Sequence, residues 1–424
     1  MKLSFRYFAG SMLMLALPLT FTSCEGSLDD IFGEWSRPTI VAVSSITLNQ
    51  TELTKVMGGA VTLTATVAPD NATFKTVTWT TSNPAVATVT DGVVTIVGVG
   101  SAIITAKAGD KTATCTVSNP FLPGLFTIDN TGKKVRFSMG NLQSTYNGSS
   151  WSWAFAENQW DYIGNAEGNT KVSTTSPFVA DYTGSSTTVD LFGWVGASSI
   201  WTGEAQYGIT SADNITYLGK TNGYGNKNGS EGETLKSDWG TLPITNGGNT
   251  ANYGWRTLTI AEWAWILGNQ YTANPGTNCR ISGSTANGTS DARFTFATIN
   301  TDDTPVNGLI IFPDGVTIAN GEATSWGNIN AQPTGGVWAN STKCTTAQWT
   351  ALAAKGCVFL PAAGWRGVTT VSYSGTTGRY WSSSPDGTST VSAMYLLFHW
   401  NAFAPIDSNS RDAGCSVRLV YDAE

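Results

Sequence analysis

The chain has 424 residues and a formal net charge of −7, and only 12% of its residues are charged. Its length predicts two or three domains, and its acidic balance excludes an electrostatic surface for nucleic acid or anionic lipid. The single histidine, His399, excludes histidine-rich metal sites and leaves little for histidine acid–base catalysis. Abundant glycine and aromatic residues favour a mainly β protein with a few helices.

The sequence of the N-terminus is typical of a secretory signal. Lys2 and Arg6 precede a mostly apolar stretch over 12–21, which is too short to span a bilayer. We therefore predict that residues 1–23 form a signal peptide.

The end of this signal, Leu19 to Cys24, resembles a bacterial lipobox, in which the cysteine is acylated and becomes the first mature residue. The resemblance implies lipidation of Cys24 and a tether over 24–42. Glu25, Asp29 and Asp30 resemble the acidic tract that directs lipoproteins of the Bacteroidetes lineage to the outer face of the outer membrane. A plain signal peptide with a chance cysteine is the alternative.

Residues 43–118 show the alternation of half-buried β-strands. Apolar and polar residues alternate over 61–67, 93–97 and 113–117, and turn residues such as Asp91-Gly92 separate these runs. Short strands at this spacing predict a small β-sandwich with Cys115 in its core.

One set of residues in this module resembles the bacterial group 2 immunoglobulin-like domain: Trp79, Ser82, Ala87, Val89, Gly92, Val94, Gly98, Gly100, Ile104 and Ala106. Such domains commonly serve as stalks, and some bind ligands themselves. No exposed aromatic cluster or charged patch is visible in the sequence here, so we expect a stalk.

A Pro-containing segment over 119–124 predicts a hinge before a long module at 125–424. Two helix starts stand out in this module: Thr259 with Glu262, and Thr345 with Gln348. Each pair has the spacing of a capping box, in which both residues satisfy each other's backbone N–H. The rest reads as short strands and long loops.

Several sequence blocks of this module occur in an order that resembles the Fibrobacter major paralogous family. They are residues 135–142, 155–162, 190–194, 255–263, 359–366, 380–384 and 416–419. That family is similar in fold to C-type lectin-like domains and to the formylglycine-generating enzyme. The resemblance implies an α+β, C-type-lectin-like second module.

An oxidase of the formylglycine-generating type would need reactive cysteines near the C-terminus. Cys415 stands where the scaffold needs an apolar side chain, and Glu262 has a structural task as a helix cap. We therefore predict no catalytic residues, no enzyme activity and no cofactor. Asp302-Asp303 lacks the spacing of a calcium loop, so calcium binding has no sequence support.

After Cys24 the chain has five cysteines, an odd number, and no pair has CxxC spacing. The sequence therefore argues against zinc or redox chemistry. Disulfide pairing among Cys279, Cys344, Cys357 and Cys415 stays open.

The stretch from Tyr395 to Arg411 is the predicted recognition surface. Met394, Leu396 and Phe398 alternate on the expected core face. The opposite face and the following loop supply the candidate ligand-binding residues: Tyr395, Leu397, His399, Trp400, Asn401, Phe403, Ile406, Asn409 and Arg411. Aromatic side chains with short polar neighbours are common on recognition surfaces. The alternative is that Trp400 and Phe403 cap a core.

Together these features predict a non-catalytic cell-surface lipoprotein, with a stalk and a lectin-like head that binds an extracellular glycan or protein. The two rival functions are an oxidase-like enzyme and a purely structural surface or matrix component.

Overall fold

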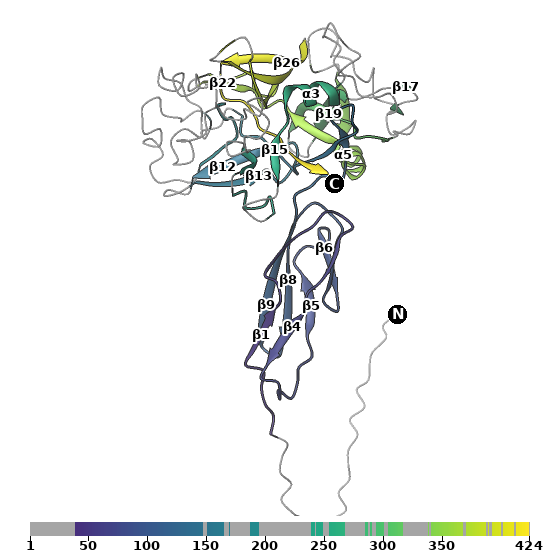
Figure 1. The fold of residues 1–424 in the computed structure, drawn as a ribbon, viewed down its shortest axis with the longest axis vertical. Helices are drawn as coiled ribbons and strands as arrows, with labels where there is room; N and C mark the ends of the chain where they lie inside the picture. The colour runs from purple at the N-terminus through teal and green to yellow at the C-terminus, as the bar shows by residue number, and fades with distance from the viewer. Residues whose placement is uncertain are drawn as a thin grey trace, which may run out of the picture.

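The computed structural model describes residues 39–146, 151–164, 169, 187–194, 239–241, 243–248, 254–267, 285–286, 289–290, 294–300, 304–316, 338, 341–367, 370–386, 389, 392–399, 402–410 and 413–423. Figure 1 shows a slender β module below a broader second module. Within the described ranges, no helix is long and apolar enough to cross a membrane.

The slender module is the predicted immunoglobulin-like sandwich. Its strands are β1 (Ser45–Leu48), β2 (Glu52–Thr54), β3 (Ala60–Thr62), β4 (Ala65–Ala68), β5 (Thr78–Thr81), β6 (Ala87–Thr90), β7 (Val93–Ile96), β8 (Gly100–Ala108) and β9 (Lys111–Asn119). One sheet has the order β2-β9-β8-β5, a second has the order β3-β7-β6, and β1 pairs with β4. Val94, Ile104 and Cys115 are fully buried in one cluster, which confirms the prediction that Cys115 is a core residue.

The segment 61–67, predicted as one strand, is two strands in different sheets. Val61 in β3 pairs with Val94, whereas Val67 in β4 pairs with Ile46 of β1. Leu63 lies between them, is buried, and donates its N–H to the carbonyl oxygen of Gly92 at 2.8 Å. The apolar side chains before and after Leu63 both pack toward the interior of the module. The alternation of apolar and polar residues therefore continues through Leu63 and does not reveal that the chain changes sheet there.

The second module is mainly β. Its strands are β10 (Phe126–Thr127), β11 (Lys134–Phe137), β12 (Leu142–Tyr146), β13 (Trp151–Phe155), β14 (Thr187–Val189), β15 (Trp255–Thr257), β16 (Thr285–Ala286), β17 (Thr289–Ser290), β18 (Phe294–Asn300), β19 (Pro305–Ile311), β20 (Thr342–Thr345), β21 (Val358–Pro361), β22 (Trp365–Gly367), β23 (Thr370–Ser372), β24 (Thr377–Pro385), β25 (Ser392–His399), β26 (Ala402–Ser410) and β27 (Leu419–Ala423). A short 3₁₀ helix, η3 (Trp239–Thr241), and the α-helices α3 (Ile260–Leu267) and α5 (Thr346–Ala354) complete the described part.

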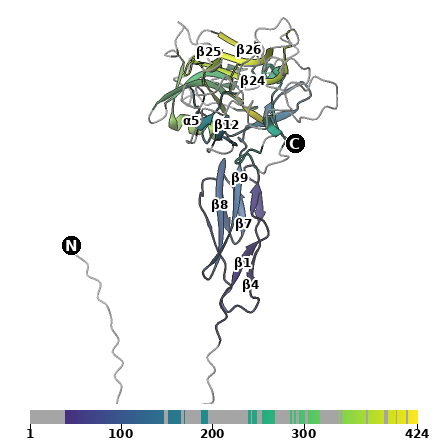
Figure 2. The same ribbon diagram turned by 90° about the vertical axis from the view of Figure 1, so that its left-hand side faces the viewer.

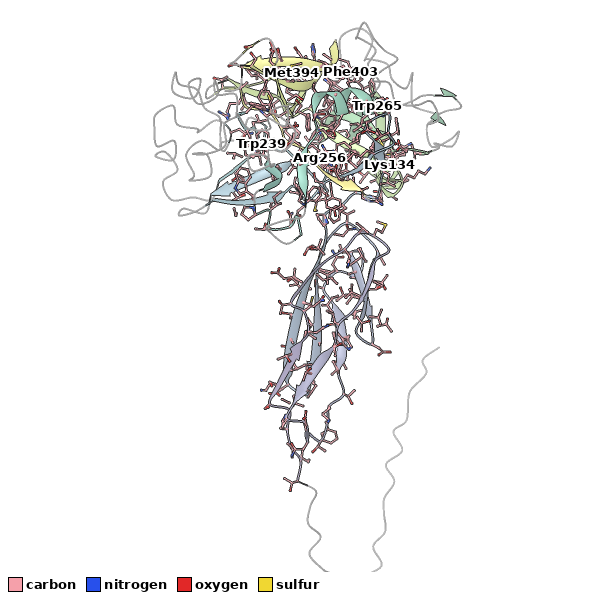
Figure 3. All side chains as sticks on the ribbon, viewed as in Figure 1. Lys134, Trp239, Arg256, Trp265, Met394 and Phe403 are labelled. Carbon is pink, nitrogen blue, oxygen red and sulfur yellow. The ribbon has the colours of Figure 1, made fainter. Side chains whose placement is uncertain are left out.

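Its strands form several small sheets, and three of these carry the functional argument. They have the orders β10-β11-β27-β15, β20-β18-β19-β21 and β24-β25-β26. Figures 1 and 2 show β26 at the end of the second module farthest from the first. In Figure 3, Met394 and Phe403 mark this distal end, whereas Arg256 and Lys134 lie nearer the first module.

Both predicted capping boxes are present. At the start of α3, the Glu262 N–H donates to Thr259 Oγ1 at 3.2 Å, and the Thr259 N–H donates to Glu262 Oε2 at 2.7 Å. At α5, Thr345 and Gln348 make the same reciprocal bonds, at 3.2 and 2.9 Å. The predicted structural role of Glu262 is therefore confirmed.

The segment predicted as a hinge, 119–124, is instead packed against the second module. Phe121 and Leu122 are each 4% exposed and belong to two different core clusters. The side-chain amide of Asn119 donates to the carbonyl oxygen of Gly98 at 2.9 Å, and the Met139 N–H donates to that of Pro120 at 2.8 Å. Pro120 and Pro123 suggested an exposed linker, but Phe121 and Leu122, which lie between them, are buried in the hydrophobic core.

Candidate functional site

The sheet β24-β25-β26 positions the predicted recognition residues. Directly paired residues share a face of a sheet, and here Arg379 pairs with Leu397, Trp381 with Tyr395 and Thr377 with His399. The face that carries Tyr395 therefore also carries Arg379, Leu397 and His399.

Tyr395 is not exposed, which corrects the sequence prediction. It is 3% exposed, and its ring meets that of Trp381 edge to face at 5.9 Å. Its hydroxyl donates to Asp407 Oδ2 at 2.8 Å. Desolvation, followed by the nearby Asp407 charge, raises the pKa of Tyr395, so the phenol stays protonated. The sheet is packed on both faces at this point, so strand alternation did not identify a solvent face.

Phe403 is also buried rather than exposed. It lies directly across from Phe398, is 5% exposed, and stacks on Phe294 with ring centroids 4.3 Å apart. Only Trp400 and Asn401 separate β25 from β26, so Phe403 belongs to a strand and not to a loop. The alternative that this aromatic residue caps a core is the correct one.

The expected core face of β25 is confirmed at two of its three positions. Leu396 and Phe398 are fully buried, whereas Met394 is half-buried. Leu397, His399, Ile406 and Asn409 are half-buried as well. Trp400, Asn401 and Arg411 lie outside the described residues.

An arginine that the sequence analysis missed lies at the centre of this face. The Arg379 guanidinium carbon is 4.3 Å from the centroid of the Trp365 ring and 5.3 Å from that of Tyr395. Such cation–π contacts hold a guanidinium in a fixed orientation. The sequence did hold one sign of this role: Arg379 stands two residues before Trp381, so the two side chains lie on the same face of the strand. Only the pairing of Arg379 with Leu397 in the structure, however, places Arg379 on the predicted recognition surface.

We call Trp365, Arg379, Leu397 and His399 the distal patch. Arg379 Nε and Trp365 Nε1 are buried and have no hydrogen-bond acceptor among the described residues. Desolvation, and then the positive charge of Arg379, lowers the pKa of His399, which favours the neutral imidazole. Trp365 and Leu397 also pack against the core cluster that contains Tyr395. The half-buried Arg379 side chain is therefore the group of this patch that is suited to binding acceptor-rich groups such as carboxylates.

The described cysteines are buried thiols with no disulfide among them: Cys115, Cys344, Cys357 and Cys415. Desolvation raises the pKa of both Cys344 and Cys415 to about 12. A thiol in this state is a poor nucleophile. Cys24 and Cys279 lie outside the described residues. Within the described part of the chain, no three His, Cys, Asp or Glu side chains gather as metal ligands.

Asp190, in the second module, is a buried carboxyl group with no cation in contact with it among the described residues. Asp190 is fully buried, and its oxygens accept from the Asn169 side-chain amide and the Ile163 N–H, both at 2.7 Å. Desolvation raises the pKa of Asp190 to about 6, although these hydrogen bonds partly oppose the shift. These bonds link Asp190 to Ile163 and Asn169, and neither involves a residue of the distal patch.

This raised pKa predicts a specific pH dependence of stability. The folded state holds the Asp190 proton more tightly than the unfolded chain, whose pKa is near 3.9. The stabilisation is therefore complete below about pH 4 and is lost as the pH rises through about 6, a loss of about 3 kcal/mol at most. Asp190→Asn should remove this part of the slope, as measured by urea unfolding between pH 4 and 7.5.

The amide in Asp190→Asn cannot accept at both oxygen positions, so absolute stability also changes, and the slope is the informative quantity. Asp161→Asn is the matched control because Asp161 is not buried. An unchanged slope in Asp190→Asn would contradict the prediction.

Comparison with known proteins identifies the first module. Residues 42–117 match the model of the bacterial Ig-like domain (group 2). An Ig-like virion protein of Serratia phage KSP90 is 47% identical over 83 residues, which is 19% of this chain and 32% of that protein. An alpha-L-arabinofuranosidase of Bifidobacterium longum is 43% identical over 87 residues, 19% of this chain and 8% of that protein.

An uncharacterised protein of Clostridium acetobutylicum is 37% identical over 112 residues, 26% of this chain and 11% of that protein. The chain thus covers about a third or less of each relative's length. The family match confirms the predicted resemblance of this module to the bacterial group 2 immunoglobulin-like domain, at residues 42–117.

Proposed function

We propose that this chain is a non-catalytic, surface-displayed binding protein, anchored by lipid at Cys24. In this proposal the immunoglobulin-like module is the stalk, and the C-type-lectin-like second module binds an extracellular glycan or protein. The observation that carries the proposal is the distal patch. Three of its residues, Arg379, Leu397 and His399, lie on the sheet β24-β25-β26, at the end of the second module farthest from the stalk (Figures 1 and 2). A binding surface at that end would be held away from the membrane.

Three further points support this function over the rivals. The packed segment around Phe121 joins head and stalk firmly, as a displayed binding surface requires. The buried Cys415 thiol, with its raised pKa, does not suit an oxidase mechanism. One relative is named as a virion protein, so a particle surface is a second location for such a stalk, but the leader at 1–23 favours a cell surface here.

The anchor is tested by Cys24→Ala in the producing cell. We expect the wild-type protein to partition into detergent and to be cleaved by protease added to intact cells, because the lipid would hold it on the outer face. Cys24→Ala should yield soluble protein, since it removes the acylated side chain. Cys115→Ala is the control, because Cys115 is a core residue of the stalk. Protection of the wild type in intact cells would contradict surface display.

The binding surface is tested with a glycan array and a matched panel of extracellular proteins. Arg379→Met and Trp400→Ala should each weaken binding of the captured ligand by about 2 kcal/mol, roughly 30-fold. Ile103→Ala, an exposed stalk position, should have no effect on binding. A ligand that binds both variants as tightly as the wild type would show that recognition lies elsewhere. Absence of binding on both arrays would favour the structural function.

A further inference from the structure

A cavity of about 540 Å³ lies at the junction of the two modules. Thr54, Lys55 and Val56 line it from the stalk, and the second module contributes Phe121, Leu125, Arg136, Tyr421 and Ala423. Its volume is in the range of small-molecule sites, which occur preferentially at domain interfaces. The distal patch contributes none of these residues.

The head wall of this cavity is set by strand pairing. Arg136 of β11 pairs with Tyr421 of β27, which in turn pairs with Trp255 of β15. The three side chains therefore follow one another across the same face of the sheet. Since Tyr421 and Arg136 both line the cavity, a guanidinium lies beside a phenol ring.

The aromatic side of this wall is rigidly packed. Phe121 stacks on Trp255 with ring centroids 5.1 Å apart, and it meets Tyr421 edge to face at 5.0 Å. Trp255 and Tyr421 are 6.2 Å apart. Aromatic surfaces fixed in this way bind flat apolar groups at low entropic cost.

The charge of the lining has one sign. Among the described residues that line it, Arg136 and Lys55 are the charged ones, and none carries a carboxylate side chain. Asp422, the neighbour of Tyr421, pairs with Val135 and so lies on the opposite face, where it contacts Arg256 at 2.7 Å and Lys133 at 3.2 Å. It therefore does not neutralise the cavity.

Arg136 is held in place, and among the described residues it has no carboxylate partner. Its guanidinium donates to the carbonyl oxygen of Pro123, which is a neutral acceptor. Desolvation lowers the pKa of Arg136, which means that the half-buried cation is incompletely solvated. An anion in the cavity would compensate for that loss of solvation.

We propose that this junction cavity binds a small organic anion, a carboxylate carried on a flat or cyclic apolar body. The carboxylate would lie between Arg136 and Lys55, and the ring would lie against Tyr421 and Phe121. Because the two cations come from different modules, the site exists only in the assembled two-module chain.

The proposal is tested by calorimetric titration of the full chain carrying Cys24→Ala, with 2-naphthoate as the probe and the neutral 2-naphthamide as its isostere. The carboxylate should bind roughly tenfold more tightly than the amide, because only it gains charge-assisted hydrogen bonds. Raising the salt concentration from 0.05 to 0.5 M should weaken the carboxylate alone, a range chosen to shorten the screening length to roughly 4 Å.

Four variants locate the site. Arg136→Gln and Lys55→Gln should each lower the affinity for 2-naphthoate by roughly five- to tenfold and leave that for 2-naphthamide unchanged. Leu125→Trp should fill the cavity and abolish binding of both probes. Lys107→Gln, on the exposed face of β8, is the matched control and should change neither. Lys55 is exposed, so Lys55→Gln keeps the test valid even if Arg136→Gln disturbs folding.

Equal affinity for the two probes would overturn the proposal, as would binding that survives Leu125→Trp. Failure of the wild-type chain to bind either probe would overturn it as well.

Discussion

Phe403→Ala is expected to lower the free energy of unfolding of the head by about 3–5 kcal/mol, the usual cost of truncating a buried phenylalanine. The ring is 5% exposed and stacks on Phe294 at 4.3 Å, with Phe296 at 6.2 Å. Its removal leaves a cavity between β26 and the sheet that contains β18, and neither strand can move freely to fill it. Phe403→Ala should therefore lower the free energy of unfolding far more than the removal of an exposed side chain would.

The measurement is urea unfolding followed by tryptophan fluorescence, which reports mainly on the head because most of the 17 tryptophans follow residue 124. Ile406→Ala is the matched control, since Ile406 lies on the same strand but is half-buried. It should cost clearly less than Phe403→Ala. A loss below about 1 kcal/mol for Phe403→Ala would show that the ring is not part of the core.

Glu262→Ala should be the second large effect, with a loss of about 3 kcal/mol or more. The carboxylate of Glu262 caps α3 and also binds Arg256 through both of its oxygens, at 2.7 and 2.9 Å. Arg256 is 2% exposed, so the substitution leaves a buried cation with Asp422 as its remaining carboxylate partner. Desolvation lowers the pKa of Arg256, but Glu262 and Asp422 outweigh it and the net pKa is raised.

The second helix supplies the matched control. Gln348→Ala removes the same reciprocal cap from α5, where the side chain is half-buried and caps without an ion pair among the described residues, so it should cost about 0.5–2 kcal/mol. Glu262→Gln separates the two effects at α3, because the amide oxygen can still cap while the charge is gone. Equal losses for Glu262→Ala and Gln348→Ala in urea unfolding would show that the ion pair with Arg256 contributes nothing.

The helix starts and the first module could be predicted from sequence because their causes are local. A capping box depends on two residues three positions apart, and Thr259 with Glu262 and Thr345 with Gln348 meet that condition without tertiary help. The β-sandwich follows from alternation over short runs, although the alternation did not show that the chain changes sheet at Leu63.

The burial of the candidate recognition residues could be predicted only in part. The sequence indicated the alternation of β25, and it correctly assigned Leu396 and Phe398 to the core. It could not show that Tyr395, on the other face, packs against a second core cluster. Alternation separates two faces of a strand but does not tell which of them meets water, because that depends on the sheets and loops packed on each side.

The sequence by itself determined the class of the protein: an acidic, aromatic-rich, mainly β chain with an immunoglobulin-like module. Only the tertiary structure decided which polar groups come together. Arg379 meets Trp365 through strands separated in the chain, and the cavity brings Lys55 of the first module to Arg136 and Tyr421 of the second. The physical reason is that side-chain burial and charge neutralisation depend on contacts between distant segments, which neither composition nor local periodicity records.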